Sequence, residues 1–458
     1  MIKGGPVTKF SILFIFEVFA KNTISILQVS LIFYLTKTLT LDAKQSYRWL
    51  SSFGMIAYAS PLFAGYLTDK VIGTSRAMVL GLLIMLVGSV LALHHHLHYA
   101  LIGIVLIGTG SGFFKPNILT LLDRLFQKHN ENRALYFGRF YLASSVGEVI
   151  AVIIGGVLAE SFLIYNPFYI SALSIFTVLA LFLYNQKEIF EFPPKKIPIN
   201  YKYLLGALIF PIILYLSIFY GANEVILVTA LAALIWVIKR YNADSENDKK
   251  TSLKIFIMIV YGAIFFSLTV QCYFSLNLAI ENFVDRKISM NISIPTYWFL
   301  LINPLVSLLV GNYISEYFKK FSIVKRMFYG FVTLSLGYFI LFVGFFYSKS
   351  HINMWVIISS YTILIAASFI IIPQLISELI YSISPKYKSR GVGFWYLTMA
   401  LAQYLAGHIA TFIHPNLETT TSKNLSTSFL YIFIFTIIFL IGLRINYKKL
   451  SYIFIEKN

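Results

Sequence analysis

The chain has 458 residues, of which 58% are hydrophobic, 17% aromatic and only 12% charged. Soluble domains usually carry about a quarter charged residues, so this composition excludes a secreted domain, a disordered protein and a cytosolic enzyme and indicates a polytopic membrane protein. The net charge of +18 is typical either of nucleic-acid binding or of the basic loops that orient a membrane protein.

About fourteen apolar runs follow one another along the chain, and each approaches the ~20 residues that a helix needs to cross a bilayer. Hydrocarbon offers no water to backbone polar groups, and no run alternates like a barrel strand, so each run is expected to be an α-helix. The fold class predicted is therefore an all-α polytopic membrane protein. The runs lie near 9–36, 47–66, 77–95, 99–121, 136–158, 166–186, 203–220, 223–238, 254–280, 296–317, 326–347, 352–382, 391–413 and 427–446.

The basic residues between these runs predict the orientation of the chain. If the N-terminus is cytoplasmic, most Lys and Arg residues fall in cytoplasmic segments, and few fall on the opposite side. An even number of helices then places both termini in the cytoplasm. The expected location is the cytoplasmic (inner) membrane, and the charge needs no nucleic acid to explain it.

Two hydrophilic segments, Pro193–Asn200 and Asn242–Thr251, flank a pair of helices with no intramembrane charge. Six helices precede this pair and six follow it, which is the layout of a transporter built from two bundles. The domains predicted are an N-terminal six-helix bundle at 1–190, a linker with two extra transmembrane helices at 191–252, and a C-terminal six-helix bundle at 253–458.

Five ionisable residues fall well inside predicted spans. A charge at the bilayer centre costs on the order of 2.5–3.5 kcal/mol, so each needs a partner or a water-filled cavity. Glu17 and Lys21 are four residues apart, in the order that favours an ion pair on one helix face. This pair either satisfies itself at a helix interface or lines a transport pathway. The five residues are Glu17, Lys21, Lys115, Glu148 and Glu378.

Lys115 stands beside a predicted bend. Pro116 has no N–H to donate to the carbonyl of Gly112, and this missing hydrogen bond is expected to bend the helix. Gly108, Gly110 and Gly112 would let a neighbouring helix approach closely. A lysine in this position either contacts an anion in a cavity or extends its side chain toward the membrane surface.

Other polar residues indicate less. Glu378 lies about two turns from the cytoplasmic end of its helix and could reach the surface. The single cysteine, Cys272, cannot form an intramolecular disulfide, and no Cys/His spacing resembles a structural zinc site. A histidine cluster in one external turn could hold a metal, although a solvated loop is the simpler interpretation: His94, His95, His96 and His98.

Short motifs spread over nearly the whole chain resemble those of one family. Residues 112–117 (GFFKPN) resemble its helix 4 signature, and residues 137–141 (FGRFY), with Gly147 further on, resemble its helix 5 signature. Residues 58–61 (YASP) and 302–304 (INP) resemble its motifs in helices 2 and 8. By these motifs the chain resembles a divergent member of the proton-dependent oligopeptide transporter family of the major facilitator superfamily.

This resemblance implies a fold and a gate. The fold would be that of the major facilitator superfamily, with two six-helix bundles and an extra helix pair. Residues 65–76 resemble the superfamily's loop between helices 2 and 3. In that loop Asp69, Lys70 and Arg76 would lock a cytoplasmic gate.

The sequence departs from the family where the family carries protons. Glu17 and Lys21 occupy the helix 1 motif, but Ala20 stands where that motif has a second glutamate. Val270 and Phe369 replace the glutamates of helices 7 and 10. Proton coupling of the family's usual kind is therefore in question.

The resemblance and the buried charges together predict a substrate site. Lys115 and Lys21 would attract a substrate carboxylate, because an ammonium binds an anion far better in a low dielectric than in water. Tyr58 and Asn303 would donate hydrogen bonds to the substrate, and Trp395 would form a wall of the pocket.

Proton coupling is expected at Glu17, Lys21 and Glu148. Ionised Glu17 would pair with Lys21, and protonated Glu17 would release Lys21 for the substrate. Glu148 lies three residues after Ser145, where the family has an asparagine. It is either a relocated carboxylate or an ordinary helix contact.

The predicted function is secondary active transport of di- and tripeptides or peptide-like solutes by alternating access, coupled to protons. A related carrier for amino acids or another small carboxylate solute, uncoupled or exporting, is one alternative. A membrane nutrient receptor that does not transport is another. The expected partners are a small-molecule substrate, protons and lipid, without nucleic acid or cofactor. No constellation of nucleophile and base indicates an enzyme.

Overall fold

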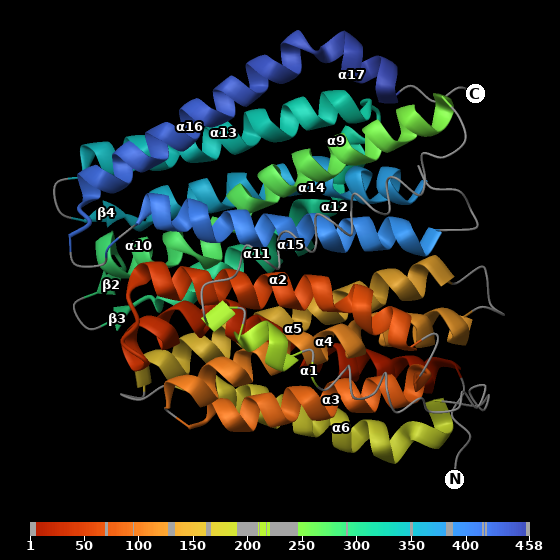
Figure 1. The fold of residues 1–458 in the computed structure, drawn as a ribbon. Helices are drawn as coiled ribbons and strands as arrows, with labels where there is room; N and C mark the ends of the chain where they lie inside the picture. Colours follow the sequence, from red (N-terminus) through yellow and green to blue (C-terminus); the bar gives the residue numbers. More distant parts are fainter. Residues whose placement is uncertain are drawn as a thin grey trace. The chain divides into compact units, whose positions relative to one another are not determined.

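The computed structural model describes most of the chain, and the described residues are largely helical (Figure 1). Contacts between helices divide the chain into two units. Unit 1 contains Met1–Leu41 and Ser52–Ile226, and unit 2 contains Asp42–Ser51 and Leu227–Asn458. The described residues are 6–68, 72–94, 96–126, 133–161, 166–189, 209, 211–216, 218–219, 246–289, 292–348, 351–381, 388–414, 416 and 419–454.

The long helices of unit 1 follow the apolar runs of the first half of the chain. Here α1 packs against α5 and α6, while α3 packs against α4 and α6. The helices are α1 (Pro6–Phe33), which continues as the π-helical turn η1 (Tyr34–Thr38), α2 (Ala43–Leu67), α3 (Thr74–Ala92), α4 (Leu97–Phe126), α5 (Arg133–Ser161) and α6 (Phe168–Ile189). The first part of α2, up to Ser51, belongs to unit 2.

Unit 2 contains the helices of the second half. In this unit α13 packs against α14 and α16, and α15 packs against α9. The elements are α9 (Glu246–Thr269), η4 (Val270–Tyr273), α10 (Ser275–Phe283), η5 (Thr296–Leu301), α11 (Ile302–Val306), η6 (Ser307–Gly311), α12 (Asn312–Phe318), α13 (Ile323–Tyr347), α14 (Met354–Tyr381), α15 (Lys388–Ile413), α16 (Ser422–Ile445) and α17 (Tyr447–Phe454).

Unit 2 also contains two small strand pairs, which the sequence did not predict. The parallel pair joins β1 (Val284–Asp285) to β4 (Ile352–Asn353), and the antiparallel pair joins β2 (Lys287–Ser289) to β3 (Ile292–Ser293). Within unit 2 these strands lie at one end of the helices, and α17 lies at the other (Figure 1).

Glycines let α4 lie directly against its neighbours in unit 1. A Cβ at Gly110 would lie 2.6 Å from the carbonyl oxygen of Gly81 on α3, and one at Gly108 would lie 3.1 Å from the side chain of Ile56 on α2. Ser60 of α2 donates a hydrogen bond of 3.1 Å to the Gly108 carbonyl. The close helix approach predicted before Lys115 is therefore confirmed.

The helix predicted over 254–280 is interrupted. After α9 the chain makes the 3₁₀ turn η4, and Phe274 (φ −107°, ψ −111°) separates it from α10. Side chains satisfy the carbonyls that the break leaves without helical partners. Tyr338 donates to Leu268 O at 2.8 Å, and Tyr361 donates to Cys272 O at 3.4 Å. The prediction of one continuous helix here is wrong, since these cross-helix donors stabilise the break.

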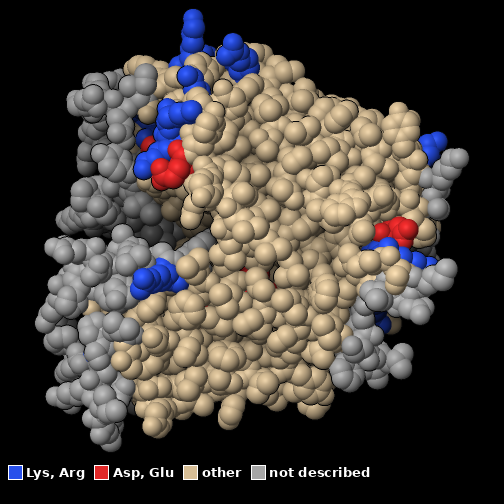
Figure 2. All heavy atoms as spheres, turned by 180° about the vertical axis from the view of Figure 1, so that it is seen from behind, with Lys and Arg blue, Asp and Glu red and all other residues tan. Residues whose placement is uncertain are grey.

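The predicted fold class is confirmed. By length and composition, nine helices in the described part of the chain can cross a membrane. Figure 2 shows charged side chains at the margins of one face and a broad uncharged area between them, as lipid contact requires. The run near 223–238 lies outside the described residues, and the run near 203–220 is described only in fragments. The extra helix pair and the three domain boundaries therefore remain predictions.

Candidate functional site

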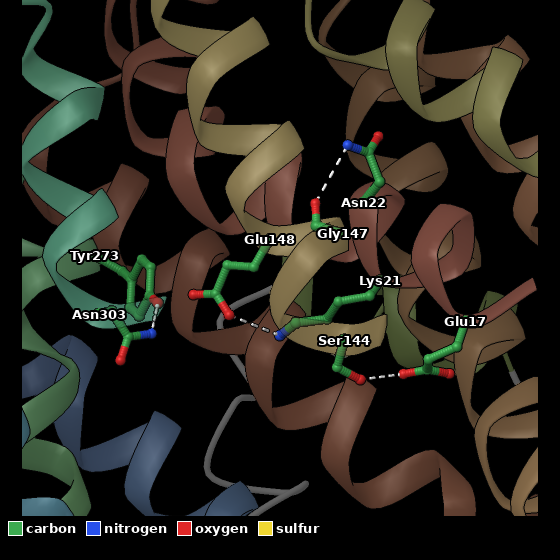
Figure 3. Close-up of polar contacts among 8 residues, drawn as sticks. All are labelled: Glu17, Lys21, Asn22, Ser144, Gly147, Glu148, Tyr273 and Asn303. Carbon is green, nitrogen blue, oxygen red and sulfur yellow. Dashed lines mark hydrogen bonds and ion pairs between the residues drawn. The ribbon is translucent and has the colours of Figure 1, made fainter. Parts of the chain in front are cut away.

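Two contacts between side chains join α1 to α5 in unit 1 (Figure 3). The hydroxyl of Ser144 donates a hydrogen bond to the carboxylate of Glu17. One turn further along both helices, Lys21 Nζ lies 3.5 Å from Glu148 Oε2. The side chains of Lys21 and Glu148 are 24% and 13% exposed, so this ion pair is largely shielded from solvent.

Gly147 permits these contacts because it brings the two backbones together. A Cβ at Gly147 would collide with the carbonyl oxygen of Val18 and would lie 3.1 Å from the Cβ of Lys21. Asn22 Nδ2 donates to the Gly147 carbonyl at 3.4 Å (Figure 3), and Ser174 of α6 donates to Asn22 Oδ1 at 3.0 Å. The α1–α5 contact is thus also tied to α6.

The predicted ion pair between Glu17 and Lys21 is wrong. Lys21 pairs with Glu148 instead, and Glu17 accepts the hydrogen bond from Ser144. The physical reason is the close approach at Gly147, which brings partners on α5 within reach of both α1 side chains. Spacing along one helix cannot reveal such partners.

Lys115 lies on α4 of the same unit and is half-buried. Its ammonium is 5.8 Å from the centre of the Tyr58 ring on α2, within the range of a cation–π interaction. The positive charges of Lys115 and Lys21 both act on the Glu17 carboxylate. With Glu148, these side chains form a group of two acids and two bases whose formal charges cancel.

In unit 2 the predicted residues Asn303 and Trp395 have aromatic neighbours. Asn303 Nδ2 donates to the hydroxyl of Tyr273 at 2.9 Å (Figure 3). The Trp395 ring lies edge-to-face against Phe266, with the centroids 5.2 Å apart. Tyr273 was not predicted as a site residue, because only the break at η4 places its hydroxyl beside Asn303.

Phe369 and Val270 stand where the family has carboxylates, and neither side chain carries a polar atom. A Cβ at Gly311 would lie 2.8 Å from the Phe369 ring, so that ring fills the space beside η6. Val270 begins the 3₁₀ turn and is half-buried. The carboxylates described in unit 2 all lie near helix ends, at Asp42, Glu281, Asp285, Glu316 and Glu378.

Glu378 pairs inside unit 2. Lys254 Nζ lies 2.8 Å from Glu378 Oε2, and Gln374 donates to Oε1 at 3.0 Å. The Lys254 side chain is only 8% exposed. A free carboxylate at the membrane surface, which the sequence allowed, is therefore not what the structure shows.

The predicted gate residues and the histidine cluster are described only in part. Arg76 is exposed in the first turn of α3, while Asp69 and Lys70 lie outside the described residues. His98 Nδ1 is 2.7 Å from the Tyr215 hydroxyl, and the rings of His94 and His96 approach Tyr99. In the described part of the chain, no group of three or more His, Cys, Asp or Glu residues is arranged to hold a metal ion.

A family model described as "Major Facilitator Superfamily" matches residues 13–407. The chain belongs to the major facilitator superfamily. It is a multi-pass membrane protein, as its apolar helices already indicate. The superfamily fold predicted from the motifs is confirmed by this match.

Two named relatives are bacterial permeases. Dipeptide and tripeptide permease B of Photorhabdus asymbiotica is 24% identical over 401 residues, which cover 83% of this chain and 81% of the relative. Dipeptide and tripeptide permease A of Pectobacterium carotovorum is 26% identical over 405 residues, which cover 82% of this chain and 78% of the relative.

Solved structures of transporters share the fold. A peptide transporter POT in complex with sulfate superimposes with a TM-score of 0.84 at 18% identity, over 97% of this chain and 95% of that one. A POT family transporter in complex with 5-aminolevulinic acid superimposes with a TM-score of 0.84 at 20% identity, over 96% of each chain.

Proposed function

We propose that this superfamily member is a secondary active transporter, and not an enzyme, that carries di- and tripeptides or peptide-like solutes across the cytoplasmic membrane. The observation that carries the proposal is the group of charged side chains within the membrane-spanning helices of unit 1. Charged side chains are energetically costly in a membrane and usually mark a functional site. The similarity to two dipeptide and tripeptide permeases supports the substrate class.

Lys115 is the proposed anchor for the substrate carboxylate. Its ammonium rests on the Tyr58 ring, which stabilises the positive charge without neutralising it. An anion entering this low-dielectric region would gain more from the ammonium than it would in water. Lys21 would join Lys115 in binding the carboxylate once its pair with Glu148 opens.

Unit 2 would bind the rest of the solute. The Asn303 amide and the Tyr273 hydroxyl are hydrogen-bonded to each other and could each turn to a peptide group. Trp395, packed on Phe266, would contact apolar side chains of the substrate. Transport would follow alternating access, in which the two halves of the transporter expose the bound solute to each side in turn.

Proton coupling would depend on α1 and α5, since Val270 and Phe369 cannot carry protons. Opening of the Lys21–Glu148 ion pair would free Lys21 for the substrate. Glu17, the other carboxylate of this group, would bind and release the coupled proton. Replacing Glu17 with glutamine should abolish accumulation driven by a pH gradient while sparing counterflow exchange, and equal loss of both activities would reject a coupling role for Glu17.

The transporter would lie in the inner membrane with both termini in the cytoplasm. This orientation follows from the excess of basic residues in the segments assigned to the cytoplasm. There Asp69, Lys70 and Arg76 would form the cytoplasmic gate, between bundles bounded near residues 190 and 253.

A second substrate class is a small amino-acid-like carboxylate. Two observations favour it: a POT family transporter with the same fold was solved with 5-aminolevulinic acid, and the carboxylates described in unit 2 all lie near helix ends. Such a solute would need only the cations of unit 1 for its carboxylate.

Uptake into proteoliposomes tests the proposal. Labelled dipeptides, tripeptides and amino acids are presented with and without an inward proton gradient. We expect gradient-stimulated accumulation of a dipeptide. Thermal stabilisation by peptides without uptake would indicate a receptor, because a bound ligand raises the melting temperature by mass action. Accumulation of amino acids alone would favour the second substrate class.

A further inference from the structure

We propose that Ser144 is a positioning residue for the titration of Glu17, so that α5 supplies a partner to each of the two ionisable groups of α1. This inference rests on the proposed function, because it assigns a part of the coupling machinery. The observations that carry it are the Ser144–Glu17 hydrogen bond and the Lys21–Glu148 ion pair (Figure 3).

The two contacts form a ladder between α1 and α5. Glu17 and Lys21 are four residues apart on α1, and Ser144 and Glu148 are four residues apart on α5, so each contact lies one turn from the other. Gly147 lies between the rungs and holds the backbones too close for any side chain at that position. The register of the two helices therefore fixes which α5 residue faces which α1 residue.

A serine hydroxyl suits a carboxyl group that changes its protonation state. It donates to the ionised carboxylate, and by rotating about its C–O bond it accepts from the protonated acid. Glu17 can thus bind or release a proton without moving from its place on the ladder. The Lys21–Glu148 ion pair can meanwhile stay closed, because neither of its members is needed to satisfy Glu17.

The groups that face Glu17 can be named for each helix packed against α1. Lys21 lies on α1 itself, Lys115 on α4, and Glu148 on α5. Helix α6 presents Ser174 at Asn22, and its charged residues are confined to its last turn. The charged residue of η1 is Lys37, which lies more than five turns from Glu17 along the helix. Only Ser144 gives Glu17 a hydrogen bond from another helix among the described residues.

The decisive comparison is Ser144→Ala against Ser145→Ala. Each variant loses one serine hydroxyl from α5. Ser145 is the next residue and points about 100° further around the helix, so only Ser144→Ala removes the hydroxyl that contacts Glu17. A carboxylate that loses a donor holds its proton more tightly. We expect the midpoint of the pH profile of dipeptide uptake to move about one pH unit toward alkaline pH in Ser144→Ala and to stay in place in Ser145→Ala. Ser144→Thr, which keeps the hydroxyl, should restore the wild-type midpoint.

A second measurement needs no substrate. The melting temperature of each purified variant is recorded against pH. The inflection of this curve in Ser144→Ala should lie about one pH unit further toward alkaline pH than in Ser145→Ala. Equal profiles for both alanine variants would overturn the assignment of Ser144. Lack of peptide uptake by the wild type contradicts the proposed function instead, while the melting profiles still decide the role of Ser144. If Ser144→Ala does not fold, the comparison is made with Ser144→Cys, whose thiol is a weaker donor.

Discussion

At the residue scale, unit 1 differs from ordinary membrane helices in the charges that it holds within its spans. Each has a partner from another helix: Glu17 and Lys21 from α5, and Lys115 from the Tyr58 ring of α2. Such partners lower the energetic cost of a charge in the membrane, and the charge can still interact with a substrate. These residues are therefore the first to change when the function is tested.

Replacing Lys115 with alanine should reduce dipeptide uptake and counterflow exchange alike, by at least about tenfold, because the substrate carboxylate loses its cation. Proteoliposome assays measure both activities. Lys37→Ala is the matched control, since Lys37 also lies over an aromatic ring, that of Phe33, at 5.1 Å. Unimpaired transport in Lys115→Ala would remove the anion site from the proposal.

His414 predicts a dependence of stability on pH. It follows α15, is fully buried beside Phe283, and neither ring nitrogen has a hydrogen-bond partner among the described residues. Burial lowers the pKa of His414 from 6.5 to about 4. The unfolded chain therefore binds a proton more readily than the folded one between these values, so the free energy of unfolding falls as the pH drops from 6.5 toward 4, by up to about 3 kcal/mol.

The melting temperature of the purified protein between pH 7.5 and pH 4.5 checks this prediction. The His414→Leu variant should lose much less stability than the wild type over that range. His408, exposed on α15, is the control, and His408→Leu should behave like the wild type. A wild-type curve that stays flat below pH 6.5 contradicts the role given to His414.

At the element scale, close helix contacts and helix breaks place the site residues. Gly147 sets the register of α1 against α5, and Gly110 brings α4 against α3. The turn η4 divides a long apolar run and turns Tyr273 toward Asn303. Side-chain donors from α13 and α14 satisfy the carbonyls at this break, so it is a stable part of the fold.

A methyl group at Gly147 should therefore be destabilising. In Gly147→Ala the new Cβ meets the Val18 carbonyl, and such overpacking costs about 1–3 kcal/mol. The melting temperature should drop, and uptake should fall because both rungs of the ladder separate. Gly442→Ala on α16 is the control, since a Cβ there meets nothing within 4 Å, and it should be neutral or stabilising. Equal melting temperatures for the two variants would argue against the close α1–α5 contact.

At the scale of the whole molecule, the chain has two units and a pronounced asymmetry of charge. The charged residues described near the middle of spans belong to unit 1, whereas the Lys254–Glu378 ion pair of unit 2 lies near the ends of its helices. The proposed division of labour follows: unit 1 would bind charge and protons, while unit 2 would bind peptide groups and side chains.

Orientation in the membrane can be checked at the two ends of α16. In a Cys272→Ser background, Lys423→Cys should react with a membrane-impermeant maleimide on intact cells, and Lys448→Cys only after permeabilisation, because both termini are expected in the cytoplasm. Both lysines are exposed. The opposite labelling pattern would reverse the proposed topology.

Much of the fold could be predicted from the sequence, because hydrocarbon imposes a simple rule on every segment. A run of about twenty apolar residues has to form a helix there, so the helices of the described residues were expected close to where they lie. The same rule made the buried charges conspicuous, and the glycines before Lys115 predicted close packing. Motif resemblance then indicated the superfamily, which the family model confirms.

The partners of those charges were decided only by the tertiary structure. Nothing in the sequence distinguishes Ser144 from other serines in apolar helices, and Tyr273 and Lys254 belong to no recognised motif. Glu17 was expected to pair along its own helix, yet the register of α5 against α1 pairs Lys21 with Glu148 instead. Hydrophobicity acts on each segment separately, so the sequence by itself determines which segments enter the membrane. A hydrogen bond depends on a few tenths of an ångström between different helices, and only their packing sets that distance.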